Sequence, residues 1–396
     1  MTAAKPGRLE RFTRVARESG TLWACTLALD RIVPFGALRL WSPRVVTERA
    51  LAEQVDAILE AWGMPGAERT ITVEKILYAD LHGIDSHGCC MFPFYQQLRD
   101  EGRLDAKATV AVVQENASTA LVDGGGGLGH APGTRAMEIA IEKSRATGVG
   151  VVAVRHSGHY GAAGAYAAMA AERGLIGLAT TSTPTPAVVP TFGRKPMLGT
   201  NPIALAAPAG RNRPFLLDMA TSTVSLGKLL ERWRSGRSIP PGWAVDARGQ
   251  PLTNGRVAAQ QRRLAPLGGD RDGGSHKGYG LAVVVEILSA ILPGIALADP
   301  GAGRREEVGH FFLALDPARF REAAGFAGDL DQLLDSLRGA EPVDPRQPVL
   351  VAGDPEQATL ARRRREGIPL TRSVFEDLRA VARAAGAPFL LDAGSP

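Results

Sequence analysis

The sequence predicts an α+β protein with two lobes, one helical and one built around a β-sheet. Two observations predict this fold class. Between residues 45 and 81, apolar residues recur at helical spacing on both sides of a break at residues 63–66. From residue 109 onward the pattern changes to short runs rich in Val and Ala, which are typical of buried strands. With 396 residues, 45% of them hydrophobic, the chain is long enough to bury a large core.

The later elements follow from the same patterns. Strands are predicted at residues 110–113, 119–122, 149–154 and 175–181, and apolar segments at 203–207 and 215–217 interrupt the Pro- and Gly-rich loops that follow. Helices are predicted at residues 133–147, 162–173, 279–292, 326–337 and 374–384. We therefore expect an N-terminal arm at residues 1–43, a first helical part at 44–118, a sheet domain at 119–285 and a second helical part at 286–396. The second part would rejoin the first, so that both chain ends build the helical lobe.

Charge and cysteine content exclude several classes. Lys and Arg number 46 and Asp and Glu 41, so the net charge of +5 is small and gives little reason to expect nucleic-acid binding. The basic run at residues 362–365 is flanked by Glu356 and Glu366, which predicts a solvated helix face. Cys25, Cys89 and Cys90 are too few for a disulfide framework or a zinc cage, which fits a reducing cytoplasm.

The segment at residues 22–41 is apolar, but Asp30, Arg31 and Arg39 interrupt it and Pro34 breaks any helix. It therefore does not predict a membrane span, and no small-residue cleavage site marks a signal peptide. We interpret residues 1–43 as an amphipathic arm that packs on its own body or on a partner subunit. Association with a membrane surface is the alternative.

The sequence DLHGIDSHG at residues 80–88 forms a first candidate site after a helix. Glycines let the backbone approach a ligand closely, and a histidine such as His87 exchanges a proton near neutral pH. A helix-capping loop with solvent-facing histidines would explain the same residues.

A second candidate site lies at residues 155–161, where a strand ends and a helix begins. His156 and His159 are three residues apart, a spacing that also suits a metal, but no third and fourth ligand stand nearby. The glycine run at residues 123–129 fits a dinucleotide fingerprint poorly, and a flexible turn explains it equally well.

Three more segments are rich in small and polar residues. Residues 198–202 and 217–222 are two of them, and Asp218 follows an apolar run, where a carboxylate can orient a histidine or form an Asx turn. Residues 273–280 open a helix, so free backbone N–H groups and Lys277 can meet a phosphate or carboxylate.

Taken together, the chain resembles the malate/L-lactate dehydrogenase-like family, which includes ureidoglycolate, sulfolactate, 2,3-diketo-L-gulonate and Δ1-piperideine-2-carboxylate enzymes. The resemblance rests on DLHGIDSHG at 80–88, GHYGAAG at 158–164, LGTNPIA at 198–204, LDMATS at 217–222, IPPGWAVD at 239–246, HKGYGLA at 276–282 and GHFFLALDP at 309–317. It implies a non-Rossmann sheet domain that binds NAD or NADP, a helical domain built from both chain ends, and a homodimer with no membrane span.

The resemblance also implies roles for single residues. His87 would be the proton donor and acceptor, with Ser86 as its hydrogen-bonding neighbour, Asp218 as the carboxylate of a charge-relay group, and His159 as a further catalytic or ligand-binding histidine. Cofactor contacts would be Gly199, Thr200, Asn201, Pro202, Asp218, Met219, Ala220, Lys277, Gly309, His310 and Phe311. Thr183 and Met91 would lie beside the substrate, and no residue would bind a metal.

One departure concerns the substrate. Family members commonly carry an arginine four residues after the catalytic histidine to hold the substrate carboxylate, but this chain has Met91 there. We therefore expect a substrate larger than pyruvate or oxaloacetate, with an apolar part near Met91, Phe92 and Phe94. The alternative is that another cation, Arg155 or Arg194, binds the substrate carboxylate. The predicted function is interconversion of a 2-oxo acid and a 2-hydroxy acid, or of a cyclic imino acid and its amino acid. A catalytically silent binding or scaffolding protein is the alternative, and a metal-dependent hydrolase using His156 and His159 is a third.

Overall fold

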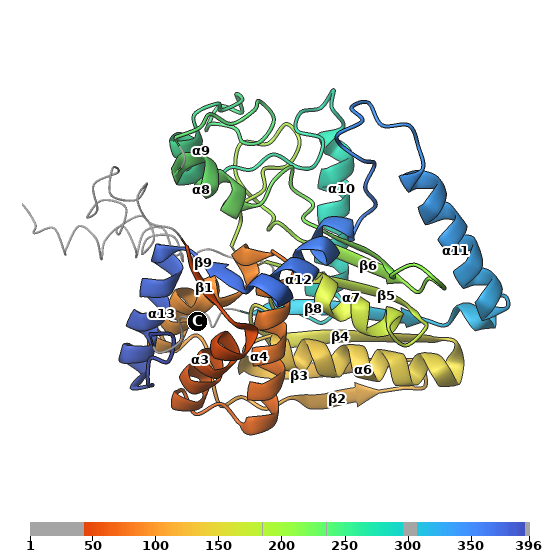
Figure 1. The fold of residues 1–396 in the computed structure, drawn as a ribbon, viewed down its shortest axis with the longest axis horizontal. Helices are drawn as coiled ribbons and strands as arrows, with labels where there is room; N and C mark the ends of the chain where they lie inside the picture. The colour runs from red at the N-terminus through yellow and green to blue at the C-terminus, as the bar shows by residue number, and fades with distance from the viewer. Residues whose placement is uncertain (1–42, 184, 235, 296–306, 393–396) are drawn as a thin grey trace, which may run out of the picture.

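The computed structural model describes residues 43–183, 185–234, 236–295 and 307–392 (Figure 1). Apart from residue 43, the predicted N-terminal arm lies outside these residues.

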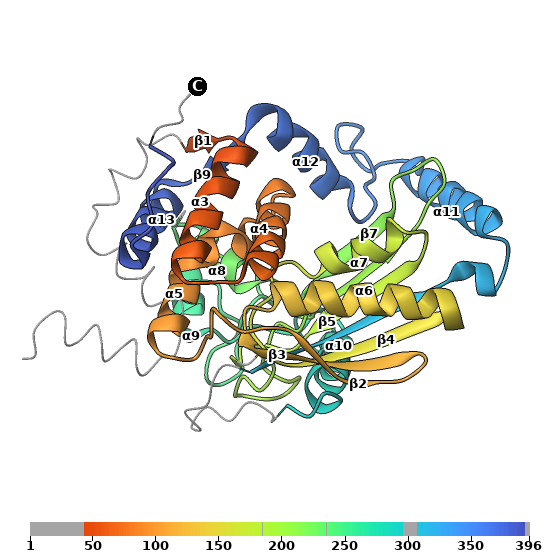
Figure 2. The same cartoon turned by 90° about the horizontal axis from the view of Figure 1, so that it is seen from below.

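The helical lobe combines the two ends of the described chain. Its first part holds α3 (Glu48–Ala61), α4 (Gly66–Leu81) and α5 (Phe92–Asp100), and its second part holds α12 (Asp354–Glu366) and α13 (Arg372–Ala385). β1 (Arg44–Val46) pairs antiparallel with β9 (Ile368–Leu370), which joins the two parts directly. Figure 2 shows α13 beside α3 and α5. A single apolar core runs through both parts, from Val46 to Leu391.

Local sequence accounts for the helix boundaries in this lobe. The Thr47 hydroxyl accepts a hydrogen bond from the Ala50 N–H, and the Thr371 hydroxyl accepts one from the Val374 N–H, so both α3 and α13 begin at a threonine N-cap. At its other end, α13 stops at Gly386, which takes the left-handed conformation that ends many helices.

The second lobe contains a mixed sheet of seven strands among the described residues, in the order β2-β3-β4-β8-β5-β6-β7. The strands are β2 (Ala111–Glu115), β3 (Thr119–Gly127), β4 (Val149–Ser157), β5 (Ile176–Thr181), β6 (Ile203–Ala207), β7 (Phe215–Met219) and β8 (Val308–Leu315). Of these pairings only β3 with β4 is parallel; the others are antiparallel.

Helices cover both faces of this sheet (Figures 1 and 2). α6 (His130–Thr147) and α7 (Gly164–Ala171) lie on one face, where a Cβ at Gly150 would come 1.9 Å from the Ala140 carbonyl oxygen. α10 (Ser275–Glu286) continues as a π-helical turn (Ile287–Ile291) on the other face, where a Cβ at Gly309 would come 1.8 Å from the Ser289 carbonyl oxygen. Side chains alternate along a strand, so His310 faces α6 and α7 whereas Gly309 and Phe311 face α10.

Two sequence expectations differ from the structure. Residues 308–315 lie in the middle of the sheet, although we placed residues 286–396 with the helical lobe; this apolar run is a buried strand. Most of the glycine run belongs to β3, where Gly125 (φ +62°) and Gly126 (φ +81°) form an irregularity that only glycine adopts easily.

A third region packs beside the sheet around α8 (Leu226–Arg234) and α9 (Gly255–Gln261) and has a small apolar core of its own. α8 reaches the helical lobe, because a Cβ at Gly227 would lie 3.3 Å from the Ser86 Cβ.

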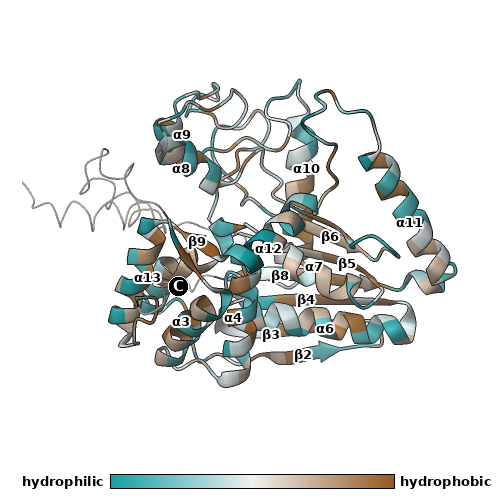
Figure 3. Ribbon diagram, in the orientation of Figure 1, coloured by the Kyte–Doolittle hydropathy of each residue, from teal (hydrophilic) through white to brown (hydrophobic). Residues whose placement is uncertain are grey.

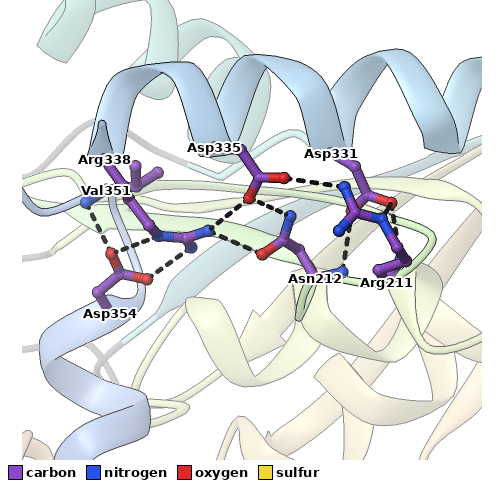
Figure 4. A network of polar contacts seen from close by, with 7 residues as sticks. All are labelled: Arg211, Asn212, Asp331, Asp335, Arg338, Val351 and Asp354. Atoms are coloured by element: carbon purple, nitrogen blue, oxygen red, sulfur yellow. Dashed lines mark hydrogen bonds and ion pairs between the residues drawn. The ribbon is translucent and has the colours of Figure 1, made fainter. Parts of the chain in front are cut away.

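α11 (Ala323–Arg338) is held at the sheet edge by a polar network (Figure 4). The buried Asp331 carboxylate accepts the backbone N–H groups of Arg211 and Asn212 at 2.7 and 2.9 Å, in the turn between β6 and β7. Arg338 then donates to Asn212 Oδ1 at 2.9 Å and to both carboxylate oxygens of Asp354 at 2.8 and 3.0 Å. The network therefore links the sheet, α11 and the first residue of α12.

Candidate active site

Two consecutive 3₁₀ turns, Asp85–His87 and Cys89–Met91, follow α4 and carry the first candidate site. The carboxylate of Asp80, which is 2% exposed, holds these turns in place, since its Oδ2 accepts the Cys89 N–H at 2.8 Å. Burial raises the pKa of this carboxyl group to about 7, although the hydrogen bond from Cys89 opposes the shift. A Cβ at Gly88 would come 2.0 Å from Asp80 Oδ1, so no larger residue fits without moving the turn.

Arg363 holds the same turn from α12. Its guanidinium donates to both carboxylate oxygens of Asp85, with a distance of 3.0 Å between Nη2 and Oδ2, and also to the backbone carbonyl of Asp80. The side chain is only 8% exposed, so the prediction of a solvated face is wrong for Arg363, whereas Arg362, Arg364 and Arg365 are exposed. α12 is among the more hydrophilic helices (Figure 3), but its period turns Arg363 inward together with Leu360.

His87 and Ser86 end the first of these turns. Ser86 Oγ lies 2.7 Å from His87 Nδ1, and the His87 ring is half-buried. Burial lowers the pKa of His87 to about 4, so its imidazole is neutral at pH 7 in the ligand-free protein.

The connection between β4 and α7 brings His159 to the same place. The rings of His87 and His159 lie 5.4 Å apart between centroids with an interplanar angle of 27°. His159 Nδ1 is 2.7 Å from the hydroxyl of Tyr95, a fully buried residue of α5. Burial, together with the neighbouring histidines 87, 130 and 310, lowers the pKa of His159 well below its usual value. The structure therefore pairs the two histidines that we selected from separate loops.

Asp218, near the end of β7, lies beside the first residue of α7. Its Oδ2 accepts the Gly164 N–H at 2.7 Å, and among the described residues no hydrogen bond joins it to His87. Asp218 keeps solvent-accessible surface, but desolvation by the surrounding protein atoms raises its pKa to about 6, against the effect of the Gly164 hydrogen bond. The expected charge-relay contact is thus not formed in this structure.

The segments predicted to hold the cofactor lie together. Asn201 adopts a left-handed conformation (φ +38°), and its Nδ2 donates to the Ala282 carbonyl at 3.1 Å and to Glu286 Oε1 at 2.9 Å, which ties the loop at residues 198–202 to α10. The Thr221 hydroxyl lies 3.1 Å from both the Thr200 and Asn201 carbonyl oxygens and bonds the next segment to this loop. Lys277 is exposed on the first turn of α10 and makes no ion pair within the described part of the chain.

The remaining candidate residues are His310 and Thr183. Both ring nitrogens of the fully buried His310 are engaged, Nδ1 with Thr181 Oγ1 at 2.7 Å and Nε2 with Ser157 Oγ at 2.9 Å. The His310 side chain therefore supports the core and is not open to a ligand. Thr183 is half-buried and packs on Gly199, where a Cβ would come 2.3 Å from the Thr183 Cβ.

Comparison with known proteins shows which proteins this chain is similar to. The family model for malate/L-lactate dehydrogenase matches residues 46–379. A malate dehydrogenase from Pyrococcus abyssi is 39% identical over 333 residues, covering 83% of this chain and 91% of that protein. An L-sulfolactate dehydrogenase from Methanothermobacter thermautotrophicus is 39% identical over 335 residues, covering 83% of this chain and 94% of that protein.

The chain belongs to the malate/L-lactate dehydrogenase family. Its fold agrees: the crystal structure of malate dehydrogenase from Entamoeba histolytica superposes with a TM-score of 0.83 at 30% identity, covering 87% of this chain and 99% of that one. Membership of the malate/L-lactate dehydrogenase family makes the chain an oxidoreductase and supports the use of NAD or NADP and a hydroxy acid.

In this malate/L-lactate dehydrogenase family member, the three apolar residues that we expected beside the substrate are buried. Met91 is 7% exposed, Phe92 is fully buried and Phe94 is 8% exposed, and all three belong to the apolar core of the helical lobe. Packing within that lobe therefore explains their apolar character.

The structure also bears on the metal and membrane alternatives. His156 pairs with Asp123 at 2.9 Å and His159 with Tyr95, so the two histidines serve different partners. Over the described ranges, no group of three or more His, Cys, Asp or Glu side chains is placed to hold a metal ion. No helix in the described part is both long and apolar enough to cross a membrane.

Sequence reasoning missed three supporting residues: Asp80, Tyr95 and Arg363. Asp80 belongs to the quoted motif, but nothing in the motif indicates that its carboxylate accepts a hydrogen bond from the turn. The only signal for Arg363 was its spacing of three from Leu360 on a helix.

Proposed function

We propose that the chain interconverts a 2-hydroxy acid and the matching 2-oxo acid, or a cyclic amino acid and its imine, with NAD or NADP, and that His87 exchanges the proton. The pairing of His87 with His159 across the two lobes is the observation that carries this proposal. It joins a residue of the helical lobe to one at the carboxyl end of a sheet strand, where ligands of α/β proteins commonly bind.

Oxidation of a hydroxy acid removes a hydride from C2 and a proton from the hydroxyl group. The bound nicotinamide supplies the hydride acceptor. His87, neutral at pH 7 because its pKa lies at about 4, accepts the hydroxyl proton through the ring nitrogen that Ser86 leaves free. In the reverse direction His87 returns this proton to the developing alkoxide, and Ser86 keeps the ring oriented throughout.

The residues fit a dinucleotide, which carries negative charge. Lys277 offers an exposed cation on the first turn of α10, where the helix end also favours an anion. In the loop at residues 198–202, Asn201 Oδ1 is buried without a hydrogen-bond partner and is thus a free acceptor. We propose that the cofactor is held by Gly199, Thr200, Asn201, Pro202, Asp218, Met219, Ala220 and Lys277, with the backbone of residues 309–311 nearby. With one parallel pairing in the described sheet, this would be a non-Rossmann binding mode.

We also propose that the chain forms a homodimer through α10 and its continuation. A row of large apolar side chains is exposed there: Leu281, Val284, Ile287, Ile291 and Leu292. Soluble monomers seldom expose a contiguous apolar row of this kind, and a self-complementary interface would bury it.

The experiment is a screen of 2-hydroxy acids, 2-oxo acids and cyclic imines with NAD(H) and NADP(H), run beside a titration of each cofactor that follows tryptophan fluorescence and melting temperature. We expect a melting shift with one cofactor and turnover of at least one acid. A shift without any turnover would favour the binding or scaffolding alternative, and no shift with either cofactor at millimolar concentration would refute the enzyme.

A further inference from the structure

Tyr95 contacts His159 at a nitrogen whose proton state can be worked out from its neighbours. The Tyr95 hydroxyl lies 2.7 Å from His159 Nδ1, and the backbone N–H of Gly161 also approaches this nitrogen, at 3.4 Å. A backbone N–H can only donate, so Nδ1 must be an acceptor. The hydroxyl of Tyr95 is therefore a donor to the same nitrogen.

This assignment fixes the other side of the ring. A neutral imidazole carries one proton, so with Nδ1 unprotonated the proton stands on Nε2. Burial and the neighbouring histidines lower the pKa of His159 and keep the ring neutral. No described residue makes a hydrogen bond to Nε2, nor is Nε2 among the buried unpaired atoms, so it is an open donor.

We propose that Tyr95 is a positioning residue that fixes His159 as an Nε2–H donor, so that His159 binds an oxygen of the substrate while His87 alone exchanges the proton. The proposal rests on the proposed function and deepens it. The two stacked histidines then have different roles. His87 takes and returns a proton, whereas His159 binds the substrate oxygen without changing its own protonation. A neutral donor matters more here because Met91 offers no charge for a substrate carboxylate.

Tyr95 is also part of a packed core, so its role must be separated from simple stability. It is fully buried against Phe92, Phe94 and His130. Tyr166 provides a matched control, because it is equally buried and its hydroxyl donates to the backbone carbonyl of Tyr160 instead of a histidine. Tyr95→Phe and Tyr166→Phe each remove one buried hydroxyl, but only the first changes His159.

The first measurement is ¹⁵N NMR of ligand-free protein labelled at histidine, with His159→Gln to assign the signal. We expect the wild-type His159 to show protonated Nε2 and unprotonated Nδ1, and Tyr95→Phe to show a mixture of tautomers, with Tyr166→Phe unchanged. Protonated Nδ1 in the wild type, or an unchanged signal in Tyr95→Phe, would overturn the proposal. The wild-type spectrum decides the tautomer even if Tyr95→Phe fails to fold.

The second measurement is steady-state kinetics with the acid identified by the screen. A donor used for binding in both ground and transition states affects KM more than kcat, so we expect Tyr95→Phe to raise KM about tenfold and to change kcat less than about threefold. Equal kinetics in Tyr95→Phe and Tyr166→Phe would overturn the substrate role. If the wild type turns over no acid at all, the proposed function fails, and the NMR result still decides the tautomer separately.

Discussion

The backbone of Gly88 rests directly on the carboxylate of Asp80: a Cβ at Gly88 would come 2.0 Å from Oδ1. The same carboxylate accepts the N–H of Cys89, so one buried side chain sets the path of the chain beside His87. Since Asp80 is buried and already hydrogen-bonded, it has little room to move aside.

Gly88→Ala should therefore displace the turn that carries His87. We expect kcat to fall at least about tenfold, because a shift of about 1 Å in a reacting group is enough for large losses, and the melting temperature to fall by several degrees. Gly66→Ala is the control, since a Cβ at that position, in the first turn of α4, meets nothing within 4 Å. Similar melting temperatures and kcat in both variants would show that the turn tolerates the methyl group.

Arg363→Met should loosen the same turn from the side of α12. Removing the guanidinium takes one donor from the Asp80 carbonyl and both of its bonds from the Asp85 carboxylate, which we expect to lower both melting temperature and kcat. Arg363→Lys should rescue little, because an ammonium cannot reproduce the two-point contact with Asp85. Arg362→Met, at an exposed neighbour, should behave as wild type in thermal melts and kinetic assays. A normal kcat for Arg363→Met would limit the role of Arg363 to packing.

His87→Ala should lower kcat by roughly 10²-fold or more while cofactor affinity stays within about twofold, because the imidazole acts on the proton and not on the dinucleotide. Kinetics and fluorescence titration measure the two quantities separately. His156→Asn is the control, because it changes an exposed histidine outside the His87–His159 pair. Asparagine also tolerates the left-handed backbone at this position (φ +46°). Near-normal turnover in His87→Ala would move the proton exchange to His159.

Asp218→Asn should stabilise the protein at alkaline pH and not at acidic pH. The pKa of Asp218 is raised from 3.8 to about 6, so the folded protein binds a proton more readily than the unfolded chain, and wild-type stability gains from this group as pH falls through 6 toward 4. Above pH 6 the desolvated charge costs stability, which asparagine removes. We expect Asp218→Asn to melt about 1–2 °C above wild type at pH 8, a modest gain because the group is exposed to screening, and to lose this advantage at pH 4. A difference that is the same at both values would contradict the shifted pKa.

Ile287→Asp should yield a monomer if the exposed apolar row on α10 is a subunit interface. Ile287 is 49% exposed, and a carboxylate in a buried apolar contact would be desolvated without a partner. Light scattering after size exclusion gives the mass of wild type and variant. Phe320→Asp is the control, as it changes another exposed apolar residue, 75% exposed and outside this row. A monomeric wild type would exclude the dimer.

Much of the fold followed from sequence pattern, because long amphipathic helices carry their own signal. The helices predicted at residues 133–147 and 374–384 are present as His130–Thr147 and Arg372–Ala385. The strand at residues 308–315 was harder, since a short apolar run without alternation does not distinguish a central strand from a buried helix segment.

The site was predictable only in pieces. His87 and His159 stand in separate motifs, and their 5.4 Å approach depends on how two lobes pack, which no local pattern encodes. The position of Asp218 shows the same limit: its chemistry suits a partner for histidine, but the packing of α7 gives it the Gly164 N–H instead.

The polar network around Arg338 connects two distant parts of the fold (Figure 4). One of its ends is the turn into β7, the strand that carries Asp218, and the other is the first turn of α12, the helix that carries Arg363. Substitutions at Asn212, Asp335 or Asp354 would therefore act on the spacing between β7 and α12. Such substitutions would reach the two sides of the proposed site without any change in the groups that we propose perform the chemistry.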